Sequence, residues 1–220
     1  MALNAEKLSI KEVHRLLGFQ KQPIGTYEML LSLEPLTSFE QQELMQIAED
    51  FDRYLIADKV PEGLVKALTT FPLIRLAGFY RYPVELCLEE SIDQISIDDP
   101  ADEDTVITGR FDILAINQTA PSGSQPFWIL LIESKNSAID PSVGLSQLLT
   151  YAFTSLMYQD SVWGLVTNGL NYQFVHLQQD TPPTYQLLPP LHLFEVDRSV
   201  LLLQTLKAIR QIALPDSAVA

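Results

Sequence analysis

The sequence predicts an α/β fold, a mixed β-sheet flanked by helices. Two short apolar, β-branched runs, 106–116 and 127–135, are separated by a turn-rich segment, which is typical of consecutive strands. A helical pattern follows at 144–153, and two further strand-like runs then surround the turn signal Asn168-Gly169. A strand meander, a crossover helix and a second strand pair give a mixed sheet with helices on its faces.

Helical signals dominate the part of the chain before this core. A capping box that begins at Ser9 predicts a helix ending at Gly18. Ser38 opens a second, longer helix with a clear apolar stripe. Pro61 suits the first turn of a third helix, which Pro72 is expected to kink or end. We expect this third helix and the helix after the core strands to cover opposite faces of the sheet.

The remaining segments complete the predicted fold. Residues 82–89 alternate apolar and polar side chains and predict a strand. The acidic stretch 91–104 has no glycine for the sharp turn of a calcium loop, so a solvated hairpin tip is the better interpretation. A proline-rich loop is expected at 181–190, and an amphipathic helix at 200–212.

Length and composition set the domain organisation. A chain of 220 residues, 47% hydrophobic and 19% charged, is long enough for one sizeable globular domain with a short appendage. We expect an N-terminal helical segment at 1–57, the α/β domain at 58–214 and a disordered tail at 215–220. No apolar run is long enough for a membrane span, and no signal-peptide pattern is present. The single cysteine, Cys87, suits a reducing compartment, so a cytoplasmic protein without a membrane partner is expected.

Three charged residues interrupt the two core strands, where an uncompensated charge is costly. Asp112 lies in the first run, and Glu133 and Lys135 end the second, where they share one face. A hairpin that turns at Ser122-Gly123 pairs residues whose numbers add up to 245, which places Asp112 opposite Glu133. Two adjacent carboxylates cannot both stay ionised unaided, and a hard divalent cation resolves this conflict.

The polar residues of this region resemble the pattern of the PD-(D/E)xK nuclease superfamily. The residues that carry the pattern are Asp112, Glu133-Ser134-Lys135 on the next strand, and Gln147 and Tyr151 on the following helix. More narrowly, the chain looks like the N-terminal nuclease domain of type I restriction-enzyme R subunits and their stand-alone cyanobacterial-type relatives, over about residues 60–177. The other segments that match these relatives are 61–63 (PEG), 76–80 (LAGFY) and 162–169 (VWGLVTNG).

The resemblance implies a restriction-endonuclease-like fold and Mg²⁺- or Mn²⁺-dependent hydrolysis of phosphodiester bonds in DNA, within a restriction-type or multi-component system. Under it, Asp112, Glu133 and the Ser134 carbonyl hold the metal ion, which polarises the phosphate. Lys135 orients the attacking water or stabilises charge on the phosphate, and Gln147 completes the catalytic set.

Two further residues enter through the resemblance. Tyr151 is implied to position the substrate backbone. Glu62 stays open between two interpretations: a further metal ligand on the helix before the sheet, or a surface residue that complements the helix dipole.

The charge of the chain argues against strong autonomous DNA binding. The formal net charge is −14, and no Lys or Arg occurs between residues 136 and 197, so the isolated chain should bind DNA weakly. The basic residues between positions 7 and 21 are either a solvated helix face or a phosphate or partner contact. An alternative function is a non-catalytic nuclease-fold module that associates with a protein partner or with itself. A third interpretation is a buried ion-paired cluster of Asp112, Glu133 and Lys135.

Overall fold

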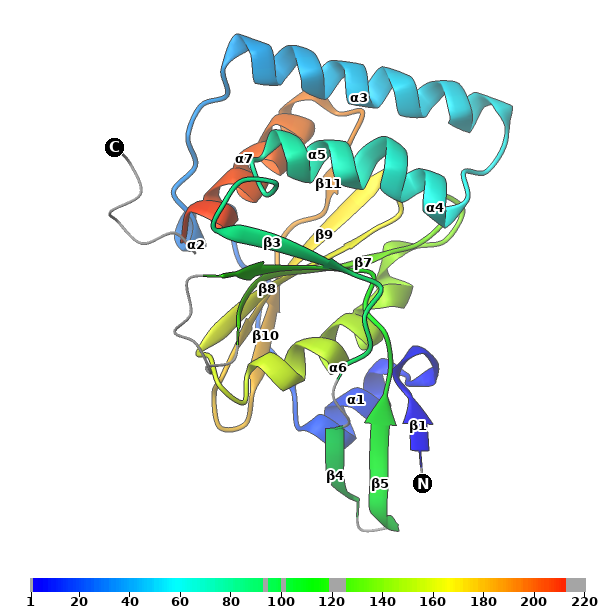
Figure 1. The fold of residues 1–220 in the computed structure, drawn as a ribbon, viewed down its shortest axis with the longest axis vertical. Coiled ribbons are helices and arrows are strands. Elements are labelled where there is room, and N and C mark those ends of the chain that lie inside the picture. Colours follow the sequence, from blue (N-terminus) through cyan, green and yellow to red (C-terminus); the bar gives the residue numbers. More distant parts are fainter. Residues whose placement is uncertain (1, 93–94, 100–101, 119–125, 213–220) are drawn as a thin grey trace.

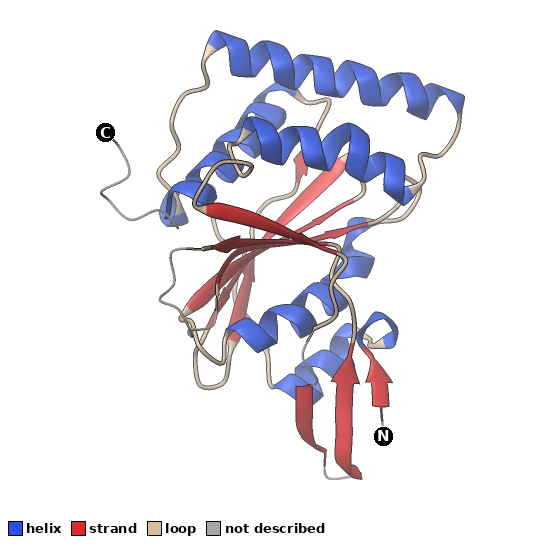
Figure 2. Ribbon diagram, in the orientation of Figure 1, coloured by secondary structure: helices blue, strands red, loops and turns tan. Residues whose placement is uncertain are grey.

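Strand β7 (Phe127–Ser134) lies inside an eight-stranded sheet that forms the middle layer of the molecule (Figure 1). The structure is a computed structural model and describes residues 2–92, 95–99, 102–118 and 126–212. Helices cover both faces of the sheet (Figure 2). The predicted α/β class, a mixed sheet flanked by helices, is confirmed, and the arrangement is consistent with a restriction-endonuclease-like fold.

The large sheet combines parallel and antiparallel pairs of strands. Its other strands are β2 (Gln20–Lys21), β3 (Val84–Leu88), β6 (Ile113–Asn117), β8 (Ser161–Thr167), β9 (Asn171–Gln178), β10 (Thr184–Leu187) and β11 (Leu191–His192). The spatial order is β2-β10-β9-β8-β7-β6-β3, with β11 also paired to β9. β7 and β8 are parallel, as strands joined by a crossover helix must be. β10 and β2 are parallel as well, and the other described ladders are antiparallel.

Two hydrophobic cores lie on the two faces of this sheet. The helices on one face are α3 (Ser38–Ala57), α4 (Glu62–Val65), α5 (Phe71–Leu76) and α7 (Val196–Ile212), and those on the other are α1 (Ile10–Leu17) and α6 (Leu145–Ser155). Successive residues of β6 point alternately into the two cores: Ile113 and Ala115 into the first, Leu114 into the second. The third predicted helix and α6 therefore cover opposite faces, as predicted. None of the described helices is long and apolar enough to cross a membrane.

The register predicted for the core hairpin is present where it matters for the charged residues. Ile113 pairs with Ile132 and Leu114 with Leu131, and both pairs add up to 245. The ladder shifts by one residue between Ala115 and Ile116, at a bulge farther from the charged end. The turn expected at residues 122–123 lies outside the described residues.

The prediction that Asp112 lies within a continuous strand is wrong. Strand β5 (Asp102–Thr108) belongs to a separate three-stranded sheet with β1 (Ala2–Asn4) and β4 (Ile95–Asp99), and β6 begins only at Ile113. The chain changes sheets across residues 109–112. A Cβ on Gly109 would lie 2.5 Å from Cε1 of Tyr151, so the fully buried tyrosine ring requires glycine at this crossing.

The structure also settles two predicted helix boundaries. The N-cap of α3 is Thr37 rather than Ser38, because the Thr37 side chain accepts the Glu40 N–H in a capping box. The third helix does not end at Pro72. A π-helical turn (Lys66–Thr70) precedes it, and such a turn changes the backbone bonding where proline offers no N–H.

The C-terminal part departs from prediction in two places. The segment expected to be a proline-rich loop contains strand β10. This strand pairs with β9 on one side and with β2 on the other. Helix α7 begins at Val196, four residues before the predicted start at residue 200. The predicted tail at 215–220 lies outside the described residues.

The first 57 residues pack on both faces of the sheet. Helix α1 contacts α6, and α3 contacts α5 and α7. The segment is not only helical, since β1 pairs with β5 and β2 pairs with β10. The division of the chain at residue 57 stays a prediction.

Two glycine substitutions test the packing of α6 on the sheet. A Cβ on Gly164 in β8 would lie 2.5 Å from Cδ2 of Leu148, a fully buried side chain, so Gly164→Ala should lower the free energy of unfolding by about 1–3 kcal/mol. Gly63→Ala is the matched control. Its Cβ meets nothing within 4 Å on exposed α4, so it should raise stability by about 0.5–1 kcal/mol. Urea unfolding measures both, and equal effects would contradict the packing.

Candidate active site

Glu133 is a carboxylate buried at the end of β7, with 2% of its surface exposed. Its Oε1 accepts a hydrogen bond from Nζ of Lys135 at 2.8 Å. Its Oε2 is buried and has no hydrogen-bond partner. A buried carboxylate oxygen without a partner is costly, and such an atom calls for a cation or another donor.

A chain of polar contacts runs from Glu133 to the sheet crossing. Nζ of Lys135 also donates to Oε1 of Gln147 at 2.8 Å, and Nε2 of Gln147 donates to the Tyr151 hydroxyl at 3.3 Å. The hydroxyl in turn accepts the backbone N–H of Arg110 at 3.4 Å. The structure thus brings Glu133, Lys135, Gln147 and Tyr151 together.

Helical spacing predicts that Gln147 and Tyr151 share a half-exposed face of their helix, but the structure buries both side chains. Their exposed fractions are 7% and 0%. The reason is the sheet crossing, because Gly109 and Arg110 pass directly over the tyrosine ring. Tyr151 therefore supports the site from beneath, and its predicted contact with a substrate stays a prediction.

Asp112 is held from two sides. Its Oδ2 accepts the backbone N–H of Ser134 at 2.7 Å, which ties it to the strand that carries Glu133. Its Oδ1 accepts a hydrogen bond from Nζ of Lys66, also at 2.7 Å. The Ser134 carbonyl as a metal ligand stays a prediction.

Lys66 is a central residue of the site that the sequence did not predict. Only 8% of its surface is exposed, and its Nζ lies 3.0 Å from Oε1 of Glu62 and 4.0 Å from Oε1 of Glu89. The signal that could have found it is the spacing of Glu62 and Lys66, four residues apart on one helix. Lys66 also links Glu62 to Asp112, so Glu62 belongs to the site rather than to a remote surface.

The rim of the site carries a further ion pair, between Arg110 and Glu89. Glu89 has a φ of 52°, a left-handed conformation that non-glycine residues rarely adopt, and its N–H donates to the Asp112 carbonyl oxygen at 3.0 Å. This turn directs the Glu89 carboxylate back over the site. Strained backbone of this kind is concentrated at functional sites.

These side chains line an open cavity of about 590 Å³. The acidic residues that line it are Glu6, Glu62, Glu89, Asp112 and Glu133, and the basic ones are Lys66, Arg110 and Lys135. The cavity is therefore acidic overall, which attracts a divalent cation and repels a nucleic-acid backbone.

Burial controls the protonation of Glu133. The pKa of Glu133 is raised to about 8, mainly because burial removes the solvation of its charged form. Repulsion from Asp112 adds to this shift, and the charge and hydrogen bond of Lys135 oppose it. The pKa of Lys66 is raised instead, because the hydrogen bond and charge of Asp112, with those of Glu62, outweigh the cost of burial. The Lys66 ammonium group therefore stays charged, while Glu133 takes up a proton near neutral pH.

The donor set fits a single hard cation. Among the residues that the structure describes, no group of three or more His, Cys, Asp or Glu side chains is arranged to hold a metal ion. Mg²⁺ needs only one or two carboxylates, because water and substrate phosphate complete its shell. Asp112 and Glu133 supply two, and the unpartnered Oε2 of Glu133 fits a cation.

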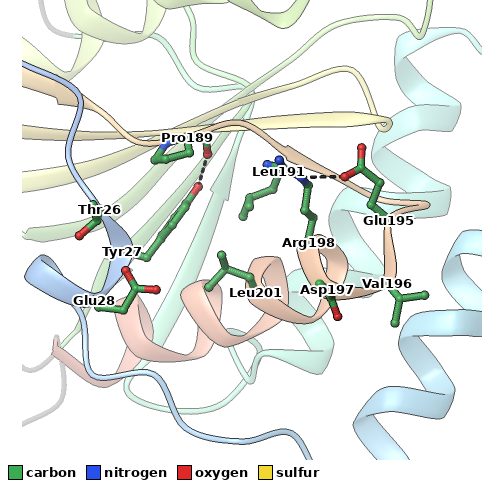
Figure 3. A pocket seen from close by; sticks show the side chains of 10 residues that line it. All are labelled: Thr26, Tyr27, Glu28, Pro189, Leu191, Glu195, Val196, Asp197, Arg198 and Leu201. Atoms are coloured by element: carbon green, nitrogen blue, oxygen red, sulfur yellow. Dashed lines mark hydrogen bonds and ion pairs between the residues drawn. The ribbon is translucent and has the colours of Figure 1, made fainter.

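Another cavity, of about 560 Å³, surrounds Tyr27 and Arg198 on the opposite part of the fold (Figure 3). The side chains of Tyr27 and Arg198 are already bonded within the protein. The Tyr27 hydroxyl donates to the Pro189 carbonyl at 2.7 Å, and Arg198 pairs with Glu195 at 2.7 Å and donates to the Pro190 carbonyl. This cavity therefore lacks the unsatisfied donors and acceptors of the site around Glu133.

Comparisons with known proteins give little beyond the geometry. No family model matches the chain, and no curated protein matches it. One similar solved structure is a fragment described as an HsdR subunit of a type I restriction enzyme from Vibrio vulnificus YJ016, with 17% identity and a TM-score of 0.39. The match covers 73% of this chain and 28% of that one. A likeness at this level assigns neither a family nor an activity.

The raised pKa of Glu133 predicts a pH-dependent stability of the metal-free protein. The folded state binds a proton at Glu133 between the ordinary value of 4.5 and about 8, whereas the unfolded state does not. The contribution of this proton to the free energy of unfolding is complete below pH 4.5 and is lost as the pH rises to about 8. The free energy of unfolding falls by at most ~1.4 kcal/mol per pH unit over this range. The stability advantage of wild type over Glu133→Gln should fall accordingly.

Chemical unfolding in the presence of a chelator, at a series of pH values, measures this difference. Glu43→Gln removes an exposed carboxylate from α3 and controls for the loss of one charge. A difference between wild type and Glu133→Gln that stays constant from about pH 5 to 8 would contradict a raised pKa at Glu133.

Proposed function

We propose that this chain is a Mg²⁺- or Mn²⁺-dependent nuclease that hydrolyses phosphodiester bonds in DNA, within a restriction-type or multi-component system. One observation carries the proposal: Glu133, buried beside Asp112 at the ends of adjacent strands, keeps one carboxylate oxygen without a partner. A folded protein rarely leaves such an oxygen unpaired unless the site has a use for it. Lys135, one step along the strand, adds a cation at the same place.

Asp112 and Glu133 would hold the metal ion, with the Ser134 carbonyl and Glu62 as further candidate ligands. When bound, the ion supplies a Lewis acid at the phosphate and lowers the pKa of a water molecule. The protein's own contribution is to fix the two carboxylates. The Ser134 N–H orients Asp112, and the apolar end of β7 keeps Glu133 in place.

Lys135 is the residue that acts on the reacting groups. Gln147 and Glu133 hold its ammonium group at 2.8 Å each, and Tyr151 holds Gln147. A cation fixed in this way orients the attacking water and stabilises the charge that develops on the phosphate. Gln147 thus acts mainly by positioning Lys135.

The acidic surroundings favour a division of labour between this chain and a partner. Of the three basic residues that line the cavity, Lys66 and Lys135 are bonded to carboxylates, and Arg110 is paired with Glu89. Few cations are therefore left to bind DNA phosphates. A protein partner that grips DNA would supply the missing affinity.

The rival proposal is a non-catalytic nuclease-fold module that associates with a protein partner or with a second copy. Two ion pairs, Lys66 with Asp112 and Lys135 with Glu133, favour a purely structural cluster. The unpartnered Oε2 of Glu133 opposes it, since a structural cluster is stabilising only when its buried atoms are all paired.

A plasmid-nicking assay with Mg²⁺ or Mn²⁺ separates the two functions. Lys135→Ala should lower metal-dependent nicking by on the order of 10²-fold or more, because it removes the charge beside the phosphate. Lys59→Ala, an exposed lysine outside the cavity, is the matched control and should keep wild-type activity. Absence of nicking by wild type, alone and with its partner, would favour the non-catalytic module.

The pairing of Asp112 with Lys66 decides which stability measurement is informative. Asp112→Ala removes the repulsion between the two carboxylates, which by itself would raise the melting temperature of the metal-free protein. It also leaves buried Lys66 without its closest anion, so it should destabilise the protein whether or not the site is catalytic. Stabilisation of wild type by Mn²⁺, which Glu133→Gln should abolish, is the sharper measurement.

DNA binding by the isolated chain should be weak and salt-sensitive. We expect a dissociation constant on the order of 10 µM or weaker near physiological salt, and tighter binding at about 50 mM than at 200 mM. Fluorescence anisotropy with a short labelled duplex measures both. Tight binding that persists at physiological salt would show that the acidic charge does not limit association.

A further inference from the structure

The ammonium group of Lys66 lies beside Asp112, in a position that also suits a metal ion. Its Nζ lies 2.7 Å from Oδ1 of Asp112 and 3.0 Å from Oε1 of Glu62, and Glu89 lies at 4.0 Å. The side chain is almost fully buried, so this ammonium group is part of the site and not a solvated surface charge.

The two lysines of the site relate differently to their carboxylates. Lys135 bonds one oxygen of Glu133 and leaves the other without a partner. At Asp112 both oxygens are engaged, Oδ1 by Lys66 and Oδ2 by the Ser134 N–H. A further cation can therefore bind next to Glu133, whereas the Lys66 ammonium group already occupies the position between Asp112 and Glu62.

We propose that Lys66 is a built-in substitute for a second metal ion, so that the centre binds one divalent ion and not two. This inference rests on the nuclease function proposed above. It assigns the position between Asp112 and Glu62 to the Lys66 ammonium group, and the position between Asp112 and Glu133 to the metal ion.

The charges of the site agree with a single ion. At the centre of the cavity, Glu62, Asp112 and Glu133 carry three negative charges when ionised, and Lys66 and Lys135 carry two positive ones, which leaves one negative charge. The sum leaves out the rim, where Arg110 and Glu89 neutralise each other and Glu6 is exposed to solvent. One divalent cation and one phosphodiester group bring the sum to zero. A second divalent cation would leave two uncompensated positive charges in a partly buried cavity, which is costly.

Titration of the full-length chain with Mn²⁺ tests how many ions it binds. Electron paramagnetic resonance measures the binding, because the signal of the free ion disappears when the ion is bound. Wild type should bind one ion, and Glu133→Gln should lose it. Lys66→Met keeps the aliphatic stem but removes the charge, so it should bind two ions, because Asp112 and Glu62 are then free. Lys66→Arg keeps a cation and should bind one.

The double variant Lys66→Met/Glu62→Gln locates the second ion and should return the stoichiometry to one. Thermal unfolding checks that each variant is folded, and the wild-type value decides the question by itself if Lys66→Met does not fold. Two ions on wild type, or one ion on folded Lys66→Met, would overturn the role of Lys66 and leave the nuclease proposal intact. No ion on wild type would overturn both.

Discussion

A carboxylate in the interior of a β-sheet must be compensated, and the burial of Glu133 imposes this requirement on everything around it. Lys135 supplies the nearest charge, Gln147 holds that charge, and Tyr151 holds Gln147. Gly144 belongs to the same arrangement, because a Cβ there would lie only 3.0 Å from Cγ of Glu133. A side chain at Gly144 would push against Glu133, so glycine favours the close approach of the start of α6 to the end of β7.

The same requirement explains how a strongly acidic chain can hold a basic group without offering it to solvent. The lysines of the site are bonded internally, one to Asp112 and one to Glu133. They neutralise carboxylates and do not form a surface patch. The net charge of −14 is therefore compatible with two lysines in the site, because carboxylates of the same cavity bind their ammonium groups.

Much of this arrangement could be predicted from the sequence, because it depends on local rules. Period-2 alternation and the turn signals were sufficient for the 245 register at Ile113 and Leu114, and for placing Glu133 beside Asp112. Capping chemistry was sufficient for α1. The bulge near Ile116 was not predictable, since it depends on how the two strands twist together.

The features that were missed depend on contacts between distant segments. Lys66 contacts Asp112, which lies 46 residues later in the sequence. The π-helical turn that begins at Lys66 has no reliable sequence signal. Tyr151 is buried because a strand crossing passes over it, and helical spacing alone cannot show this. Local patterns were therefore sufficient for the two neighbouring carboxylates and Lys135, whereas tertiary packing brings Lys66 to the site.

The crossing between the two sheets fixes the length of the chain that joins them. Strand β5 ends at Thr108 and β6 begins at Ile113, so only residues 109–112 connect the two sheets. Each end is anchored, by the Tyr151 hydroxyl at Arg110 and by the Ser134 N–H at Asp112. Deletion of one residue here would force one sheet to slip by one position and turn its side chains to the opposite face. The two sheets therefore fix the length of this four-residue spacer, and the buried Phe111 ring, packed against Trp128, fixes its position.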